Sequence, residues 1–214
     1  DVLLDRHKAV HYNLYNRLKL DLSDEVVHSD KSNEEMLIKA YREHAPIVLV
    51  NKLFNYGRYL FISSTNEDGL PPNLQGIWNG DYIPAWSSDY TQDENVQMNH
   101  WHVLPGGMHE LMNPYFKYYE SMLEDWRENA FKFFGCRGVY APLRQSDNGL
   151  MSENMPYHIW ASGAGWISKF FYDYWLFTGD LEFLKKRVVP FLKEVALFYE
   201  DFLYSGRDGK LVIC

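Results

Sequence analysis

The chain has 214 residues, enough for one large domain or for part of a larger one. Its formal net charge is −8 and it has no basic run, which argues against nucleic acid as a partner. No apolar stretch is long enough to span a bilayer, so no membrane partner is expected. Aromatic residues reach 17%, and Trp and Tyr combine a flat apolar ring with a polar group.

The first 65 residues predict helices separated by a polar segment. Apolar spacing predicts a helix over residues 2–18, and alternation over 18–22 predicts a short strand. The polar stretch 23–32 predicts a loop or boundary. Ser32 or Asn33 can cap a helix that runs to about His44. Pro46 suits the first turn of a further helix, ending near Ser63.

The segment 70–101 organises the chain. Pro71, Pro72 and Gly76 exclude a regular element in its first half, yet its aromatic residues are too costly to leave in water, so we expect an ordered loop. These aromatic residues are Trp78, Tyr82, Trp86 and Tyr90. Flat rings mixed with Asn, Gln, Ser and Asp suit a carbohydrate. A packed loop with aromatic anchors fits the same composition equally well.

A helix is expected to follow this loop. Thr91 and Glu94 predict a capping box, and the helix then runs from about residue 92 to about residue 104, before a Pro-Gly-Gly stop. Asn95, Asn99 and His102 recur at helical spacing and share one face. This face predicts either the lining of a wet cavity, which the neighbouring apolar residues favour, or an ordinary solvated surface.

The second half predicts three long helices. The first spans residues 108–134, with a kink or break at Pro114 and an end at Gly135. An extended piece over 139–143 and a polar loop over 144–157 follow. A helix over 159–177 ends at Gly179, and another spans 181–204 with a kink at Pro190. A turn over 206–209 then leads into an extended run. The pattern predicts an all-α fold with short strand pieces.

The sequence offers no cofactor or metal site. No histidine pair carries an added carboxylate at metal-ligand spacing, and no Gly-rich phosphate loop follows a strand. Cys136 and Cys214 could pair, although two buried free thiols are the favoured interpretation. The oligomeric state is left open.

Several motifs follow one another along nearly the whole chain. They are Gly57-Arg58-Tyr59-Leu60 with Ile62-Ser63-Ser64, Leu70-Pro71-x-Asn73-Leu74-Gln75-Gly76-Ile77-Trp78-Asn79, Trp86-Ser87-Ser88-Asp89-Tyr90-Thr91, Met98-Asn99-x-Trp101, Trp160 with Gly163-Ala164-Gly165-Trp166, and Phe177-Thr178-Gly179-Asp180 with Phe183-Leu184. In this order they resemble the catalytic domain of glycoside hydrolase family 95, the alpha-L-fucosidases and alpha-L-galactosidases.

The resemblance implies part of an (α/α)6 toroid, a six-hairpin glycosidase barrel. Residues 1–30 would be a linker helix and short strand leading into the barrel, and residues 31–214 its N-terminal part. The implied activity is inverting hydrolysis of terminal alpha-L-fucosyl or alpha-L-galactosyl residues, with an oligosaccharide or glycan as substrate. The resemblance also implies a secreted or periplasmic location. The family's catalytic Glu follows a run like Leu211-Val212-x-Cys214, so we expect the acid beyond this sequence and no hydrolysis by the 214 residues alone.

The resemblance also suggests the site residues. The family has an Asn-x-Asn pair, polarised by an Asp, that positions or activates water. Asn95 matches the second Asn, but Asp93 stands at the first position, and His100 stands where the family commonly has Tyr. We therefore expect Asp93 and Asn95 to be catalytic. The expected substrate-binding residues are Trp78, Asn79, Trp86, Asn99 and His102.

Asp93 could serve as the base, because a carboxylate accepts a proton from water more readily than an amide does. Alternatively, it could gain only from the helix dipole. Glu153 is the other loop carboxylate that could stand in as an acid, although a solvated loop position is favoured for it. A non-catalytic sugar-binding relative and an unrelated helical scaffold are the competing hypotheses.

Overall fold

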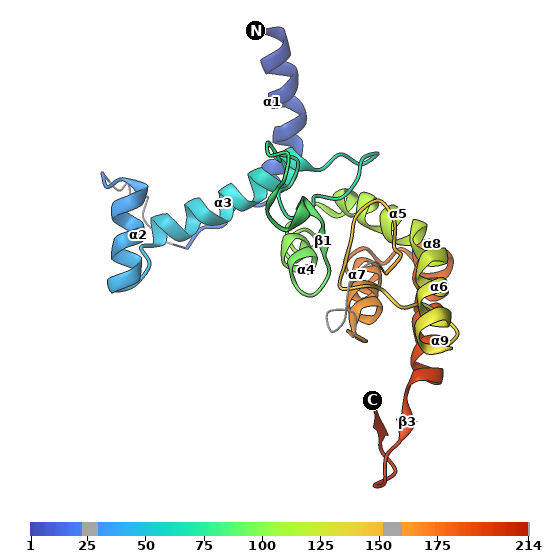
Figure 1. The fold of residues 1–214 in the computed structure, drawn as a ribbon. Coiled ribbons are helices and arrows are strands. Elements are labelled where there is room, and N and C mark those ends of the chain that lie inside the picture. The colour runs from blue at the N-terminus through green and yellow to red at the C-terminus, as the bar shows by residue number, and fades with distance from the viewer. Residues whose placement is uncertain (23–29, 152–159, 214) are drawn as a thin grey trace. The chain divides into compact units, whose positions relative to one another are not determined.

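A computed structural model describes residues 1–22, 30–151 and 160–213 (Figure 1). Its contacts divide the chain into two compact units, residues 1–65 and 66–214. Most described residues are helical and each strand has only two residues, which confirms a mostly helical fold. The toroid, and the expected barrel start at residue 31, stay predictions. In the part of the chain that is described, no helix is long and apolar enough to cross a bilayer.

The first unit contains three helices, α1 (Val2–Tyr15), α2 (Asn33–Arg42) and α3 (Ile47–Ser64). Ser32 caps α2: its Oγ accepts from the Glu35 backbone N–H at 3.2 Å, and its own N–H donates to the Glu35 carboxylate at 2.8 Å. Pro46 stands immediately before α3. The three predicted helices and the Ser32 cap are confirmed, whereas α1 ends at Tyr15 instead of residue 18 and Pro46 precedes the first turn of α3.

Residues 18–22 were predicted to form a short strand, but they follow α1 as an irregular segment that is bound by Arg58. That prediction was wrong, because these residues form no regular element and the Leu18 carbonyl accepts from Arg58 Nη1 at 2.8 Å. Arg58 Nη2 also donates to the carbonyls of Tyr15, at 2.8 Å, and Leu14, at 3.3 Å. The buried guanidinium thus binds carbonyls at and just after the end of α1, where a positive charge is also favourable.

The second unit holds the remaining helical elements. They are a short turn at Ala85–Ser88, α4 (Asn95–His100), a turn at His109–Met112, α5 (Asn113–Ser121), α6 (Leu123–Phe134), α7 (Gly163–Thr178), α8 (Leu181–Phe183), a π-helical turn at Leu184–Val188 and α9 (Val189–Phe202). Two antiparallel strand pairs accompany them. One pairs β1 (Tyr90–Thr91) with β2 (Arg144–Gln145), and the other pairs β3 (Tyr204–Ser205) with β4 (Leu211–Val212).

Proline positions explain where the long predicted helices differ from the observed ones. The helix predicted over 108–134 is divided at Met122, whereas Pro114 lies in the first turn of α5, where its missing N–H costs nothing. Pro190 likewise lies at the start of α9, directly after the π-helical turn. Gly135 and Gly179 end α6 and α7 in left-handed conformation, as predicted.

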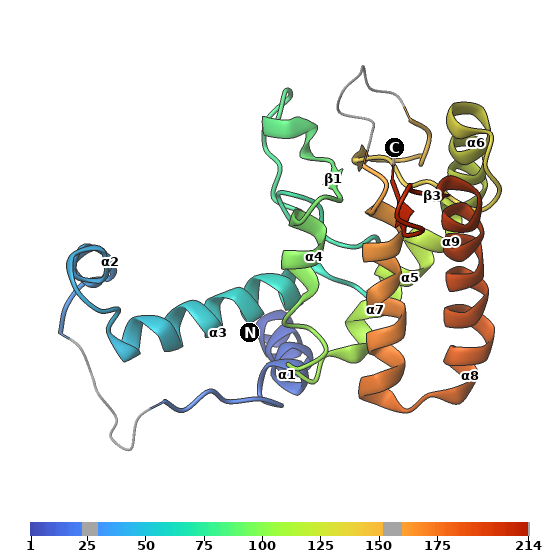
Figure 2. The ribbon, with the colours of Figure 1, turned by 90° about the horizontal axis from the view of Figure 1, so that it is seen from below.

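The core of the second unit is aromatic. The chain turns back between α7 and α9, which lie side by side (Figure 2). Phe171 and Phe191 stack between these helices with their ring centroids 4.3 Å apart. Tyr115 of α5 is fully buried, and its hydroxyl donates to the Ile167 carbonyl at 3.1 Å. The buried hydroxyl thereby keeps a hydrogen-bond partner, as most buried polar groups do.

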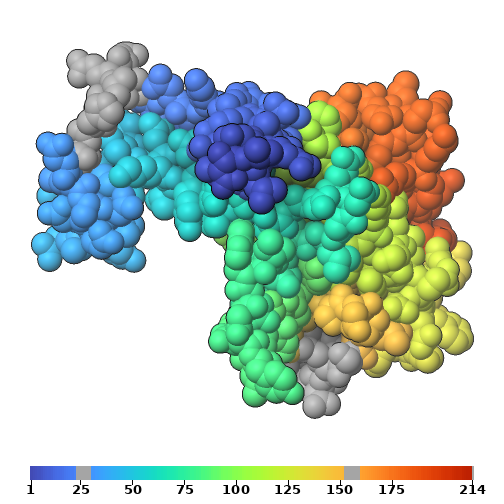
Figure 3. All heavy atoms as spheres, turned by 90° about the horizontal axis from the view of Figure 1, so that it is seen from above, coloured from blue at the N-terminus to red at the C-terminus, as the bar shows by residue number. Residues whose placement is uncertain are grey.

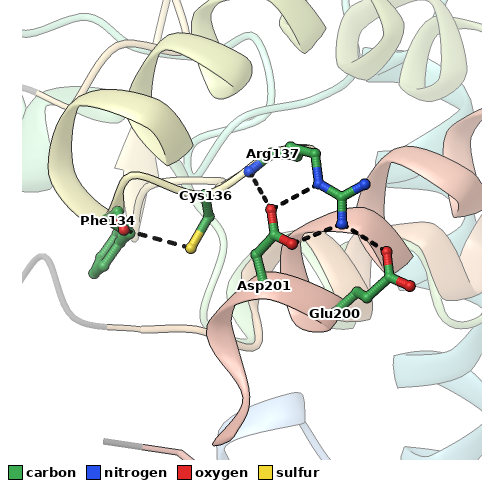
Figure 4. A network of polar contacts seen from close by, with 5 residues as sticks. All are labelled: Phe134, Cys136, Arg137, Glu200 and Asp201. Carbon is green, nitrogen blue, oxygen red and sulfur yellow. Dashed lines mark hydrogen bonds and ion pairs between the residues drawn. The ribbon is translucent and has the colours of Figure 1, made fainter.

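Arg137 connects the loop after α6 to the end of α9 (Figure 4). Its backbone N–H and Nε both donate to Asp201 Oδ2, at 2.8 and 2.9 Å, while Nη2 reaches Asp201 Oδ1 and Glu200 Oε2. These hydrogen bonds lower the pKa of Asp201 to about 2. The neighbouring Cys136 is a buried free thiol, as expected, and Cys214 lies outside the described residues.

Candidate functional site

Asn73 is the centre of the loop that precedes the candidate site. Its Oδ1 accepts from the Gln75 N–H at 2.9 Å and from Ser88 Oγ at 3.2 Å. Its carbonyl accepts from Asn99 Nδ2 at 3.4 Å. The Leu74 N–H donates to the Asp89 carbonyl at 3.2 Å. Three motifs that are separate in the sequence are therefore joined by hydrogen bonds.

The aromatic side chains of this loop divide into one anchor and three exposed rings. Tyr90 is buried, and its hydroxyl donates to the Pro71 carbonyl at 2.8 Å. Trp78 is 52% exposed, Trp86 72% and Tyr82 100%. The argument that such rings are too costly to leave in water therefore fails for these three, although the loop is ordered. The loop segment that carries them, green in Figure 3, lies at the surface of the molecule.

Asn79 shapes the tip of this loop. Its Oδ1 accepts from the Asp81 N–H at 3.0 Å, which forms a local Asx turn. Asn79 itself is exposed. The predicted substrate-binding residues Trp78, Asn79 and Trp86 therefore all project from one exposed loop.

The turn at Ala85–Ser88 holds three successive residues in left-handed conformation. The φ angles are 54° at Trp86, 56° at Ser87 and 52° at Ser88. Each such residue costs about 1–2 kcal/mol when it is not glycine. The Ser88 hydroxyl bonded to Asn73 helps to maintain the turn. Strain of this kind is often found at functional sites, so it supports a binding role for the exposed Trp86.

The polar residues after this turn enter a short β ladder. Tyr90 pairs with Gln145 and Thr91 with Arg144. The Gln92 N–H then extends the contact by donating to the Leu143 carbonyl at 2.8 Å. The position of the next residues along the chain is therefore set by β2, more than 50 residues away in sequence.

Helix α4 begins at Asn95, so the predicted start near residue 92 and the Thr91–Glu94 capping box were wrong. The Thr91 hydroxyl donates to Asp89 instead, at 2.7 Å. The Glu94 N–H donates to Gln97 Oε1 at 3.0 Å, and Gln97 Nε2 donates to the Gln92 carbonyl at 2.7 Å. The buried Gln97 amide thus holds the turn that leads into the helix.

The predicted catalytic residues flank an unusual backbone position. Asp93 and Asn95 are both exposed, and Glu94 between them has φ 136° and ψ −44°. Asp93 therefore lies before the helix, and Asn95 is its first residue. In a continuous helix their side chains would point about 200° apart, which the observed break avoids. Residues 92–94 form turns rather than an extended strand, so a joint role of Asp93 and Asn95 stays a prediction.

The single polar face predicted over residues 92–104 is shorter than expected. The helix ends at His100, so His102 lies in the turns that follow, where it is half-buried. Asn99 is also half-buried and is bonded to Asn73. Whether Asn95, Asn99 and His102 face a cavity stays a prediction.

His100 is a buried member of the aromatic core. Its Nδ1 lies 2.7 Å from the Val96 carbonyl, and its ring centroid is 4.9 Å from that of Tyr115. Burial lowers the pKa of His100 to about 4, although the hydrogen bond with the Val96 carbonyl raises it in part. The imidazole is therefore neutral at neutral pH and serves packing.

Two residues of α6 hold the second loop. Gly149 donates its N–H to Asp125 Oδ2 at 2.8 Å, and its carbonyl accepts from Asn129 Nδ2 at 2.8 Å. The Met151 N–H donates to Asn129 Oδ1 at 2.9 Å. The loop is thus fixed up to Met151, whereas Glu153 lies outside the described residues.

Sequence reasoning missed Asp89, Arg144 and Gln97. Asp89 is buried, and its carboxylate faces the Arg144 guanidinium with Nε 3.6 Å from Oδ2. The pairing of β1 with β2 brings these two residues together, and no pattern in the sequence near either residue predicts that pairing. Gln97 lies three residues after Glu94, as the second residue of a capping box does, but Glu is not among the residues that usually begin one, so the local sequence is a weak signal for it.

Comparison with known proteins places the chain among the glycosyl hydrolases. The chain belongs to family 95, because the model described as the glycosyl hydrolase family 95 catalytic domain matches residues 1–214. The family that the motifs resembled is thereby confirmed, and the hypothesis of an unrelated helical scaffold is excluded.

Curated relatives carry fucosidase names. An alpha-L-fucosidase 2 of Arabidopsis thaliana is 33% identical over 98% of this chain and 26% of its own length. A probable alpha-fucosidase A of Aspergillus niger is 32% identical over 99% of the chain and 27% of its own length. A probable alpha-fucosidase A of Aspergillus oryzae is 44% identical over 40% of the chain and 12% of its own length. The chain spans about a quarter of the length of the first two.

Proposed function

We propose that the protein containing this chain is a glycoside hydrolase of the alpha-L-fucosidase type. It removes terminal alpha-L-fucosyl, or alpha-L-galactosyl, residues from oligosaccharides with inversion at the anomeric carbon. Family membership and the names of two relatives matched over nearly the whole chain support the reaction class. Inversion follows from the family resemblance.

The observation that carries the proposal is the break between Asp93 and Asn95. Helix α4 starts only at Asn95, and both side chains are exposed. In this proposal the Asp93 carboxylate and the Asn95 amide act on the same water molecule. In this chain the carboxylate replaces the first amide of the family pair, so no further residue is needed to polarise that position.

In the mechanism we propose, the Asp93 carboxylate accepts a proton from the attacking water while the Asn95 amide orients that water. A carboxylic acid outside residues 1–214 protonates the leaving oxygen. An inverting enzyme requires about 6.5–9.5 Å between its two catalytic carboxyl groups, which leaves room for the water. The 214 residues supply the water-activating half of the site.

The exposed loop supplies substrate contacts in this proposal. The indoles of Trp78 and Trp86 offer flat apolar faces to the sugar ring, and the Asn79 amide offers hydrogen bonds to hydroxyl groups. Asn99 supports them indirectly, because its amide is bonded to Asn73 at the base of the same loop. His102 completes the polar side of the site.

The test is hydrolysis of 2'-fucosyllactose by the full-length protein, followed by proton NMR in the first minutes. The expected product is fucose that appears first as its β anomer and then mutarotates. Fucose released first as the α anomer would refute inversion, and absence of release from fucosyl and galactosyl substrates would refute the proposed reaction.

A non-catalytic sugar-binding relative is the second candidate function. Its support is that Asp93 departs from the family pair while the three exposed aromatic rings remain. This candidate predicts saturable binding of fucosyllactose in calorimetry without release of fucose. Hydrolysis by the wild-type protein would exclude it.

A further inference from the structure

Asp89 is a buried carboxylate directly before β1, and only 7% of its surface is exposed. Burial raises its pKa, and so does the nearby Asp93, whereas the Thr91 hydroxyl and the Arg144 guanidinium lower it. A carboxylate so far from water is costly unless its oxygens are paired. Such a group therefore marks a place where the fold requires a charged acceptor.

The two carboxylate oxygens of Asp89 contact both residues of one pair in the ladder between β1 and β2. Oδ1 accepts from the Thr91 hydroxyl at 2.7 Å, and Oδ2 faces Arg144 Nε at 3.6 Å. Thr91 and Arg144 are themselves that pair. The carboxylate thus holds Thr91, the last residue of β1, next to Arg144 of β2.

The backbone of Asp89 connects two further segments. Its carbonyl accepts from the Leu74 N–H at 3.2 Å, and its N–H donates to the Trp86 carbonyl at 3.3 Å. One residue therefore joins the aromatic loop, the strained turn, β1 and β2. Thr91, which it holds, is two residues before Asp93.

The turn that carries the proposed catalytic residues has few anchors of its own. The side chains of Asp93 and Asn95 are exposed and make no hydrogen bond to another residue in the described ranges. Hydrogen bonds on either side fix their positions: the Gln92 N–H donates to the Leu143 carbonyl, and the Glu94 N–H donates to the Gln97 side chain. The β1 end of this turn depends on the pair that Asp89 holds together.

We propose that Asp89 is a positioning residue for the water-activating turn Asp93–Asn95, acting through its bridge between Thr91 and Arg144. This inference rests on the proposed function for its catalytic consequence. Asp89 touches neither water nor substrate in this role. It determines where the strand ends, and hence where Asp93 and Asn95 stand relative to the aromatic loop.

The role requires a carboxylate rather than an amide. The Thr91 hydroxyl donates a hydrogen bond to Asp89 Oδ1, and the Arg144 guanidinium forms an ion pair with Asp89 Oδ2. Asparagine would place its NH2 group, itself a donor, against either the Thr91 hydroxyl or the Arg144 guanidinium. It would also remove the negative charge that the ion pair with Arg144 requires. The isosteric change Asp89→Asn therefore breaks the bridge without creating a cavity.

The kinetic test compares variants of the full-length protein with 2'-fucosyllactose. Asp89→Asn and Thr91→Val are expected to lower kcat by about tenfold or more, which corresponds to about 1.4 kcal/mol of transition-state stabilisation, while KM changes little. Thr91→Ser, which keeps the hydroxyl, should restore most of kcat. An unchanged kcat in Asp89→Asn, or a loss confined to KM, would overturn the proposal.

Glu120→Gln is the matched control. It removes another carboxylate that is paired with an arginine, because Glu120 on α5 accepts from Arg187 Nε at 2.7 Å and Nη2 at 2.6 Å. Arg187 belongs to the π-helical turn and not to the ladder. Glu120→Gln is expected to lower thermal stability. It should leave kcat within about twofold of wild type, because the pair lies away from the β1–β2 ladder and distant sites act independently.

Hydrogen exchange provides a readout that does not depend on activity. The Gln92 N–H, bonded to the Leu143 carbonyl, should exchange faster in Asp89→Asn than in wild type, but not in Glu120→Gln. Equal protection in Asp89→Asn and wild type would refute the positioning role. If the wild-type protein released no fucose, the proposed reaction would fail, while this comparison would still decide the role of Asp89.

Discussion

Lowering the pH should destabilise the fold through His100. This imidazole is fully enclosed among Tyr115, Phe170 and the α4 backbone, and its pKa is lowered to about 4 from an unfolded value of 6.5. Between these two values the unfolded state binds the proton more tightly, so stability is complete above pH 6.5 and is lost as the pH falls toward 4. With 1.36 kcal/mol for each unit of pKa difference, the loss reaches about 3 kcal/mol at pH 4.

The assay is urea unfolding of the full-length protein at several pH values between 7.5 and 4, with His100→Phe as the non-titrating comparison. Carboxylates and other histidines titrate in both proteins, so the difference between the two isolates His100. We expect His100→Phe to be less stable at pH 7.5, because it loses the contact with the Val96 carbonyl, and to recover about 3 kcal/mol relative to wild type by pH 4. Parallel curves would refute the reasoning.

Three further changes test packing and binding. Arg58→Ala should cost about 3 kcal/mol in unfolding experiments, because three carbonyls around the end of α1 lose a buried charged donor; Arg58→Lys should recover only part, since an ammonium cannot reproduce the planar geometry. Gly138→Ala should lower stability by about 3 kcal/mol or more, because its Cβ would lie 2.2 Å from the Glu194 carbonyl oxygen, whereas Gly135→Ala, with φ +65° and open space, should cost only about 1–2 kcal/mol. Equal costs for the two glycines would contradict the steric argument. Trp86→Ala should weaken binding of fucosyllactose about tenfold in calorimetry, and Trp86→Phe, which keeps a flat ring, should weaken it less; unchanged affinity in Trp86→Ala would remove Trp86 from the site.

Local signals in the sequence predicted the ends of helices well. A helix cap depends only on residues close to it in the sequence, so it can be recognised without knowing the fold. This holds for Ser32 with Glu35, for Gly135 and for Gly179. Proline was harder to interpret. Pro114 could interrupt a helix or begin one, and only the observed break at Met122 distinguishes these alternatives.

The candidate site was predicted less completely, because its geometry depends on contacts between distant residues. The Thr91–Glu94 spacing is a valid capping pattern, but the Thr91 hydroxyl is taken by Asp89, which Arg144 faces from β2. The start of α4 therefore moves to Asn95. Exposure of Trp78 and Trp86 was also unpredictable from composition, because an aromatic loop can be either packed or presented to a ligand.

The pH dependence of kcat/KM for wild type and Asp93→Asn tests the central claim most directly. The substitution restores the amide that the family carries at this position and preserves the shape of the side chain. If the Asp93 carboxylate accepts the proton from water, the acidic limb of the profile should move in the variant, and the rate near neutrality should change as well. An identical profile and an identical rate would contradict the account and leave Asp93 as a residue of the turn before α4 without a catalytic role.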